Sequence, residues 1–207
     1  MQKARRESDS FKPRIYVDTN ILQGAISRRN TEDILFLKKA KQNGWKILTS
    51  IYTLMELLDV AKDRKFLLNS IYERWIDVST FLSERKTKNL GGEDLAELAK
   101  EVNNFFIDNE VIQFINVKEN DWELVKKIGE TSNMHSSDAL HLVTAWVGNC
   151  QVLTTNDGEF VKEGNRILTE EKANNKLKVC IVQEIGKVLN EILGKEYEVE
   201  TNSLEKY

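Results

Sequence analysis

Four acidic residues stand at the ends of predicted strands or the starts of predicted helices, where their carboxylates could share one site. They are Asp18, Glu56, Asp138 and Asp157. In a parallel α/β sheet, ligands bind beyond the carboxyl ends of the strands, so all four side chains could face one edge of the sheet. Because carboxylate oxygens without a cluster of His and Cys suit Mg²⁺ or Mn²⁺, the chemistry indicated is binding of these ions rather than of structural zinc.

A simpler explanation exists for each acid taken alone, because Asp and Glu are common at helix starts and strand ends for reasons of capping. Asp138 is the plainest case, since an Asp in the first turn of a helix needs no further function. Glu56 is harder to explain in this way, because it lies between Met55 and Leu57 in a helix that is predicted to be largely packed. Four carboxylates in one cleft would repel one another strongly, so we expect them to persist there only with cations.

The two histidines are weaker candidates for metal ligands. His141 follows Asp138 at helical spacing, but a di-iron bundle would need two such pairs and further glutamates. We therefore interpret His141 as a partly buried hydrogen-bonding residue, and His135, just before the helix, as better placed to touch a substrate. The sequence contains no P-loop, dinucleotide-binding or nucleophile-elbow motif, so the usual signatures of nucleotide hydrolases, dehydrogenases and serine hydrolases are absent.

The composition bounds the setting in which these residues act. The chain has 207 residues with 41% hydrophobic and 30% charged residues, ten Gly and one Pro, which favours one mainly helical domain. Its two cysteines, Cys150 and Cys180, match no metal or redox spacing, so we expect a reducing compartment, the cytoplasm. The net charge of −3 means that a polyanionic partner would need a local basic patch or metal ions. No apolar stretch reaches the roughly 20 residues of a membrane span.

Short apolar stretches alternate with amphipathic helical patterns, which predicts an α/β domain around a mostly parallel sheet. Strands are expected at 15–17, 47–49, 111–117 and 152–154, with a fifth, edge strand at Ile167–Leu168. The stretch 179–182 is an alternative strand within a region that otherwise fits a helical period. Asn30 and Asp33 resemble a capping box at the start of one helix, and Ser50 can cap another. Helical periodicity also extends over Ala173–Ile192.

Two further helices are predicted between Asp63 and Ile107, separated by Gly91 and Gly92. Their apolar spacing indicates two inward faces. These faces comprise Leu67, Ile71, Trp75, Val78 and Leu82 in the first helix, and Leu95, Leu98, Val102 and Phe105 in the second.

Four segments, taken in order, resemble the PIN domain family. They are RIYVDTNIL (14–22), TSIYTLMELL (49–58), HSSDALHLVTA (135–145) and VLTTNDGEF (152–160). The resemblance spans Arg14 to Thr169 and implies a three-layer α/β fold with a central sheet of four to five strands and helices on both faces. The expected organisation is a flexible basic segment (1–13), a nuclease domain (14–169) with a helical-hairpin insertion (63–107), a C-terminal helical extension (170–193) and a polar tail (194–207).

PIN domains are typically Mg²⁺- or Mn²⁺-dependent nucleases, most often endoribonucleases, and many bacterial and archaeal members are VapC-like toxins. The resemblance implies that the four acids at positions 18, 56, 138 and 157 are catalytic and hold one or two metal ions. It also implies that Asn20 and Thr155 orient them. Glu159 stands where many members have a second Asp, and its role is open.

The expected partners follow from the same resemblance. RNA is the expected substrate, and Arg28 and Arg29, which follow Asp18 closely in the chain, are candidates for contacting its phosphates. A small antitoxin and a second copy of the chain are further expected partners. The alternatives are a PIN-like scaffold that binds RNA or protein without cutting and, less favoured because no phosphate-cradling loop is visible, a phosphatase acting on small substrates.

Overall fold

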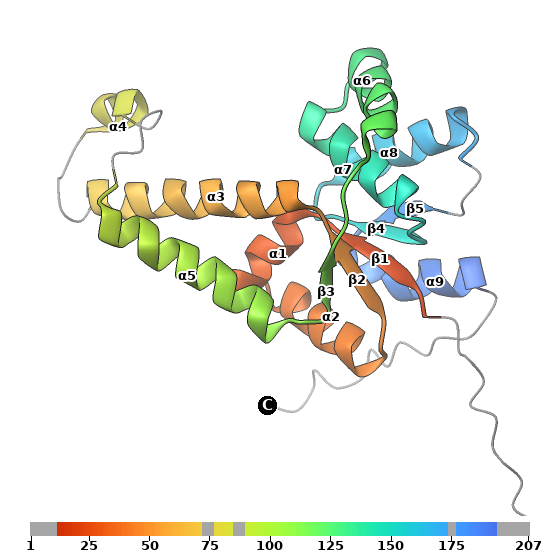
Figure 1. Cartoon of the computed structure of the whole chain (residues 1–207), viewed down its shortest axis with the longest axis horizontal. Helices are drawn as coiled ribbons and strands as arrows, with labels where there is room; N and C mark the ends of the chain where they lie inside the picture. Colours follow the sequence, from red (N-terminus) through yellow and green to blue (C-terminus); the bar gives the residue numbers. More distant parts are fainter. Residues whose placement is uncertain (1–11, 72–76, 85–89, 174–176, 194–207) are drawn as a thin grey trace, which may run out of the picture.

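The computed structural model describes residues 12–71, 77–84, 90–173 and 177–193, which form a five-stranded, all-parallel sheet with helices on both faces (Figure 1). The strand order is β3-β2-β1-β4-β5. The strands are β1 (Arg14–Val17), β2 (Lys46–Thr49), β3 (Ile112–Phe114), β4 (Val152–Thr154) and β5 (Lys178–Cys180). The α/β class and the parallel sheet predicted from the sequence are therefore confirmed.

The helices alternate with the strands along the described chain, as right-handed crossovers between parallel strands require. They are α1 (Thr19–Ile26), α2 (Thr31–Gln42), α3 (Ile51–Asn69), α4 (Val78–Glu84), α5 (Gly92–Asp108), α6 (Trp122–Thr131), α7 (Ser136–Val147), α8 (Gly158–Glu170) and α9 (Ile185–Leu193), with 3-10 turns η2 (Glu119–Asp121) and η3 (Val182–Glu184). Among the described residues, none of these helices combines the length and the apolar character needed to cross a membrane.

The sheet separates two hydrophobic clusters, because successive side chains of a strand point to opposite faces. In β1, Ile15 and Val17 pack into the cluster covered by α1, α2, α3, α5 and α9. Tyr16 packs into the other cluster, which is covered by α6, α7 and α8. Strands buried on both faces carry continuous apolar runs, which explains why these short segments were recognisable in the sequence.

The point where the strand order reverses lies between β1 and β4. The chain runs outward from β1 through β2 to β3, and then returns to the other side of β1 to form β4 and β5. The amide of Asp18 donates to the carbonyl oxygen of Thr154 at 3.0 Å, so the pairing of these two strands continues one step past the end of β1. A ligand site of an open parallel sheet is expected in this position.

The helices begin where capping side chains satisfy their first amides. Ser50 accepts a hydrogen bond from the amide of Thr53 at 3.1 Å, and Asn30 accepts one from the amide of Glu32 at 3.0 Å. Both caps were predicted. The capping box of Asn30 with Asp33 was wrong in its second half, because the side chain of Asp33 turns instead toward Asn156.

The helical insertion differs from the prediction in its start and in its inward faces. The predicted boundary at Asp63 falls inside α3, which runs without a break from Ile51 to Asn69. Helices α3 and α5 pack side by side (Figure 1). Their parts nearest the sheet contribute Leu57 and Val102 to the central core, and their other parts extend beyond the sheet. Leu98 and Val102 are buried as predicted. The exposed members of the predicted faces are Leu67, Ile71, Leu82 and Leu95, and Trp75 lies outside the described residues.

The fifth strand lies at the alternative position. Ile167 and Leu168 belong to α8 and are buried on the same helical face as Phe160. A run of two apolar residues does not distinguish a strand from part of a buried helix. Strand β5 occupies Lys178–Cys180 and pairs with β4, so the segment 170–193 is not helical throughout as predicted. The predictions for 1–11 and 194–207 lie outside the described residues.

Candidate active site

Asp18 occupies the centre of the site, at the end of β1 and at the N-cap of α1. Its side chain accepts hydrogen bonds from the amide of Thr19 at 2.6 Å and from Oγ1 of Thr155 at 2.7 Å. Burial raises the pKa of Asp18, and the nearby charge of Glu56 adds to this, while His141, Thr155 and Thr19 act in the opposite direction. The carboxylate is therefore fixed in place by donors from both neighbouring strand ends.

Glu56 projects from the second turn of α3 toward Asp18. Its Oε2 lies 2.9 Å from Nε2 of His141 and also accepts a hydrogen bond from Oγ1 of Thr19. Burial acts to raise the pKa of Glu56, but the bonds from His141 and Thr19 outweigh it, so this pKa is lowered. Glu56 is consequently held as a charged carboxylate.

His141 links three elements of the site. Nδ1 of its ring lies 2.8 Å from the hydroxyl of Tyr16 in β1, while Nε2 lies 2.9 Å from Glu56 in α3 and 3.6 Å from Asp18. Since a carboxylate only accepts, Nε2 carries a proton in either charge state of the ring. Burial lowers the pKa of His141, but the bond to Glu56 and the charge of Asp18 outweigh this and raise it. The interpretation of His141 as a buried hydrogen-bonding residue is confirmed.

Asp138 lies in the first turn of α7, as predicted, and is half-buried. Burial raises the pKa of its carboxyl group, and the negative charges of Asp18 and then Asp157 raise it further, whereas His141 and His135 act to lower it. Asp138 on α7, Asp18 after β1 and Asp157 after β4 thus share one region of negative potential.

Asp157 caps α8 after the end of β4. Its Oδ1 accepts from the amides of Glu159 at 2.8 Å and Phe160 at 3.1 Å. Capping therefore accounts for the position of Asp157, as it does for that of Asp18. A carboxylate has about four lone-pair positions, so a capping role leaves capacity for a further partner. The side chain of Glu159 is exposed in the first turn of the same helix.

Thr155 and Asn20 connect the ends of β1 and β4. The hydroxyl of Thr155 donates to Asp18 and accepts from Nδ2 of Asn20 at 2.8 Å and from the amide of Asp157 at 3.1 Å. The side-chain oxygen of Asn20 accepts from the amide of Asn156 at 3.0 Å. This network holds the loop 155–157 against the start of α1.

Several side chains in this region were not identified from the sequence. Tyr16 was counted only as part of a strand, although it binds His141. Thr19 donates to Glu56, and the exposed ring of Tyr52 lies 5.6 Å from the ring of His141. Thr19 lies next to Asp18 in the sequence, which was a usable signal. The pairing of Tyr16 with His141 depends on the fold, and no local pattern indicates it.

The four predicted acids share one edge of the sheet without forming a ready-made cage. Within the parts of the chain that the structure describes, no three His, Cys, Asp or Glu side chains are grouped closely enough to hold a metal ion as they stand. Oε2 of Glu56 is already hydrogen-bonded to His141 and Thr19. The charges of Asp18 and Asp157 act on Asp138, whose pKa is raised mainly by burial and further by these charges.

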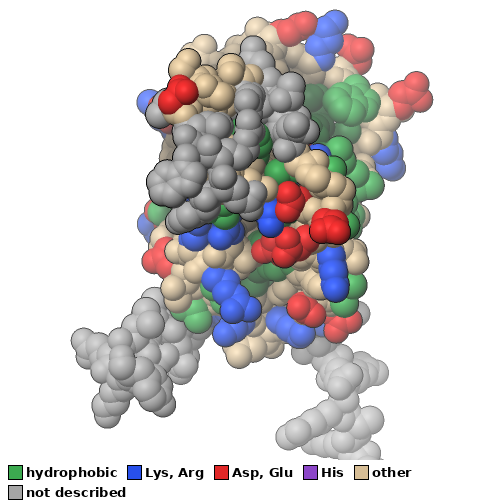
Figure 2. Space-filling model, turned by 90° about the vertical axis from the view of Figure 1, so that its left-hand side faces the viewer, with side chains coloured by type: hydrophobic (Ala, Val, Ile, Leu, Met, Phe, Trp, Pro, Cys, Tyr) green, Lys and Arg blue, Asp and Glu red, His purple; other side chains and the backbone are tan. Residues whose placement is uncertain are grey.

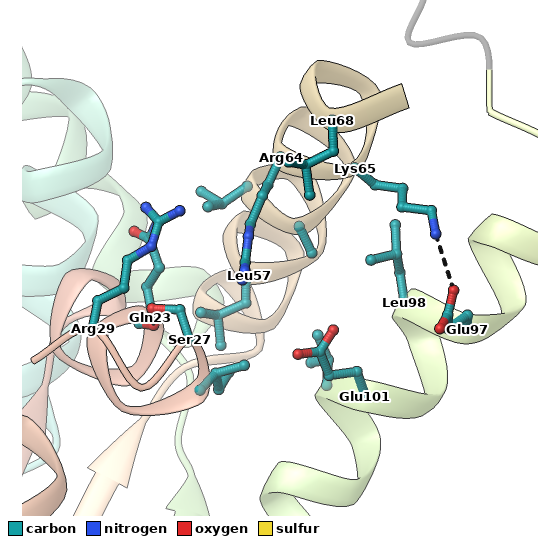
Figure 3. Close-up of a pocket in the computed structure, with 14 residues that line it drawn as sticks. Gln23, Ser27, Arg29, Leu57, Arg64, Lys65, Leu68, Glu97, Leu98 and Glu101 are labelled. Carbon is teal, nitrogen blue, oxygen red and sulfur yellow. Dashed lines mark hydrogen bonds and ion pairs between the residues drawn. The ribbon is translucent and has the colours of Figure 1, made fainter. Parts of the chain in front are cut away.

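A groove with a volume of about 240 Å³ lies beside this region, between α1, α3 and α5 (Figure 3). Leu57, Leu68 and Leu98 contribute apolar surface, and Arg29 faces the groove from the end of α1. Arg28 lines an adjoining hollow. Viewed from the side of the extended helices, the surface carries basic and acidic side chains interspersed instead of one basic patch (Figure 2).

Arg28 and Arg29 do not adjoin the carboxylates. The eight residues of α1 separate them from Asp18, which corresponds to about 12 Å along the helix axis. Their proximity to Asp18 in the sequence therefore does not make them neighbours in the site. Both side chains are exposed and could contact a ligand that extends from the carboxylates along α1.

Comparison with known proteins connects this arrangement to one family. Neither curated protein sequences nor solved structures give a significant match. The model of the PIN domain matches residues 15–164, which cover all four acids, the strands β1 to β4 and most of α8. Members of this family are generally nucleases. With nearly three quarters of its length matched and a parallel sheet of the corresponding class, the chain belongs to the PIN domain family.

Proposed function

We propose that the protein is a metal-dependent endoribonuclease that hydrolyses phosphodiester bonds of RNA at the edge of the sheet where β1 and β4 end. The observation that carries the proposal is the placement of Asp18, Asp138 and Asp157, three carboxylates from three elements, at the point where the strand order reverses. Burial raises the pKa of Asp138, and the charges of Asp18 and Asp157 add to this. Like charges held this close repel one another, and a bound cation would relieve that repulsion. Glu56, held in its charged form, completes the acidic set.

The chemistry of the donors fits Mg²⁺ or Mn²⁺, because both ions prefer carboxylate oxygens. Burial raises the pKa of Asp138, and the charges of Asp18 and Asp157 raise it further. A bound cation would offset this repulsion between the carboxylates. Asp18, Asp138 and Asp157 would hold the first ion, and Glu56 would contribute to the site from α3. Such an ion, when bound, would activate water as a nucleophile and would neutralise charge on the phosphate.

The surrounding residues of the chain orient these acids. Thr155 and the amide of Thr19 fix the two oxygens of Asp18, so its carboxylate cannot rotate freely. His141 is hydrogen-bonded to Glu56, and Tyr16 is hydrogen-bonded to His141 in turn. Because Tyr16 and His141 are buried, water does not replace these bonds. Rigid support of this kind preserves the geometry that bond cleavage requires.

RNA must approach an acidic pocket, so cationic side chains are needed along its path. Arg28 and Arg29 lie about 12 Å from Asp18 along α1, which suits contact with nucleotides that flank the scissile bond and not with that bond itself. The exposed ring of Tyr52, close to His141, is positioned for stacking against a base.

Cleavage of end-labelled single-stranded and structured RNA by the purified protein tests this proposal. Cutting is expected with Mn²⁺ or Mg²⁺, and it should stop with EDTA and in Asp18→Asn. Glu110→Gln provides a matched control, because this exposed acid precedes β3 at the opposite end of the sheet. Absence of cutting in every wild-type condition would favour the alternative of a non-cleaving scaffold, and equal cutting by Asp18→Asn would refute the assignment of the site.

A role as the toxin of a toxin–antitoxin pair is a finer proposal, and the groove between α1, α3 and α5 favours it. Arg29 and Arg64 and, on α5, Glu101 accompany its apolar lining, while Glu97 is paired with Lys65 (Figure 3). Apolar surface with charges of both signs suits an amphipathic peptide. Growth arrest on expression, relieved by co-expression of a neighbouring small protein, is the expected result. Normal growth during strong expression of the active enzyme would count against the toxin role. A homodimer is part of the same proposal, and sedimentation tests it.

A further inference from the structure

Asp33 is a buried carboxylate that lies outside the predicted set of acids. It belongs to the first turn of α2, and its side chain has no exposure to solvent. A buried carboxylate is costly unless it is hydrogen-bonded. Its long-range partner is Asn156, whose Nδ2 donates to both carboxylate oxygens of Asp33, at 3.3 and 3.4 Å. The side chain of Asn30, close to it in the sequence, is a second partner.

Asn156 lies between two residues of the candidate active site. It is the middle residue of the loop 155–157, flanked by Thr155, which binds Asp18, and by Asp157. The backbone of Asn156 is held by Asn20, through a hydrogen bond of 3.0 Å from its amide. The loop is thus anchored twice, once through the main chain to α1 and once through a side chain to α2.

The missing side chain of Gly24 leaves the space that the carboxylate of Asp33 occupies. A Cβ atom at position 24 would lie 1.9 Å from Oδ2 of Asp33 and 3.2 Å from Cβ of Asn30. The amides of Arg29 and Asn30 both donate to the carbonyl oxygen of Gly24, which closes the turn between α1 and α2 around it. Any side chain at position 24 would displace the carboxylate from Asn156.

We propose that Asp33 is a positioning residue for the active site, which acts through Asn156 to hold the loop that carries Thr155 and Asp157. This inference rests on the proposed function, since it assigns a role in placing the acids of that site. Asp33 itself touches neither substrate nor metal. Above its pKa of about 6 the side chain is a carboxylate, and a charged acceptor strengthens the hydrogen bond from Asn156.

The alternative is that Asp33 serves only the packing of α1 on α2. The two roles differ in what happens at the loop 155–157 when the bond to Asn156 is lost. If Asp33 serves only packing, its loss lowers the stability of the whole domain. Hydrogen exchange of the loop amides then changes only as much as this global stability predicts. A positioning role loosens the amides of Asn156 and Asp157 specifically, because these donate to Asn20 and Thr155.

The test compares Asp33→Leu, which removes the acceptor, with Asn156→Ala, which removes the donor. Asp33→Asn keeps an acceptor oxygen and should rescue. Glu32→Gln is the control, since it removes an exposed charge from the same helical turn.

Loss of an outer hydrogen-bonding partner costs about 10- to 100-fold in metal affinity or activity, so Mn²⁺ affinity and kcat should fall by at least tenfold in Asp33→Leu and Asn156→Ala. Their double variant should be no worse than either single one.

Hydrogen exchange of the metal-free protein, followed by NMR, provides a readout that does not depend on activity. The amides of residues 156 and 157 should exchange faster in Asp33→Leu and Asn156→Ala than global stability explains, and at the wild-type rate in Glu32→Gln. Unchanged exchange at these amides in both variants would overturn the proposal. If the wild type neither binds Mn²⁺ nor cuts RNA, the proposed function fails, while the exchange result still decides whether Asp33 positions the loop. Should Asp33→Leu not fold, the exposed position of Asn156 allows its variant to carry the test.

Discussion

Replacing Asp33 with Asn should change how the stability of the protein depends on pH. Burial raises the pKa of Asp33 from 3.8 to about 6, and the charge of Glu32 contributes, whereas hydrogen bonds from Asn156 and Asn30 oppose the shift. The folded state therefore keeps the proton of this carboxyl group at pH values where the unfolded chain has released it. Asn at this position has a similar shape and does not titrate.

The sign and size of the effect follow from proton linkage. Between the two pKa values the folded state binds more protons than the unfolded state, so the free energy of unfolding falls as the pH rises through this window. A shift from 3.8 to about 6 corresponds to roughly 3 kcal/mol over the whole window. From pH 5 to pH 8, titration of Asp33 should lower the free energy of unfolding of the wild type by about 1.4 kcal/mol. The loss is complete above the folded pKa.

Urea unfolding of wild type and Asp33→Asn at pH 5 and pH 8, in EDTA so that no metal contributes, measures this difference. Contributions of all other titrating groups cancel when the two proteins are compared at each pH. The stability of the variant relative to wild type should rise by about 1.4 kcal/mol from pH 5 to pH 8. Glu32→Gln provides the control for removing a negative charge nearby. A relative stability that stays constant between the two pH values would refute the reasoning, because Asp33 would then titrate alike in both states.

Three further predictions concern the site and its surroundings. Asp138→Asn should abolish RNA cleavage and, in metal-free buffer at neutral pH, stabilise the fold by removing repulsion from neighbouring aspartates; unchanged cleavage would contradict the assignment. Changing Arg28 and Arg29 together to Ala should raise the dissociation constant for single-stranded RNA and flatten its dependence on log salt by about 1.4, and identical slopes would exclude phosphate contacts. Tyr16→Phe should cost about 1–3 kcal/mol in urea unfolding, because it leaves Nδ1 of the buried His141 without its partner, and an unaltered midpoint would argue against this bond.

The sequence predicted those parts of the structure that depend on local patterns. The apolar runs at β1, β2 and β4 and the acids that follow β1 and β4 were recognised because strands buried on both faces lack polar residues until they end. The caps Asn30 and Ser50 were identified for a similar reason, since capping depends on residues close in sequence. Such signals were sufficient to place the acids at one edge of the sheet.

Features that depend on long-range contacts were missed. Leu67 and Leu95 follow a helical period, yet they are exposed, in the parts of α3 and α5 that extend beyond the sheet. Ile167 and Leu168 were assigned to a strand, although they lie in α8. Asp33 was assigned to a capping box, and its contact with Asn156 lies 123 positions away in the chain. A residue whose partner is so distant gives no local sign of its role.

The hydrogen bonds around Asp18 also determine when the site can form during synthesis. Tyr16 and His141 are 125 positions apart, and Thr155 and Asp18 are 137 positions apart. A growing chain that already contains β1, β2, β3 and their helices still lacks α7 and β4, which supply these partners. Loop closure over such separations is slow compared with formation of the helices. A chain interrupted before β4 therefore has no complete site.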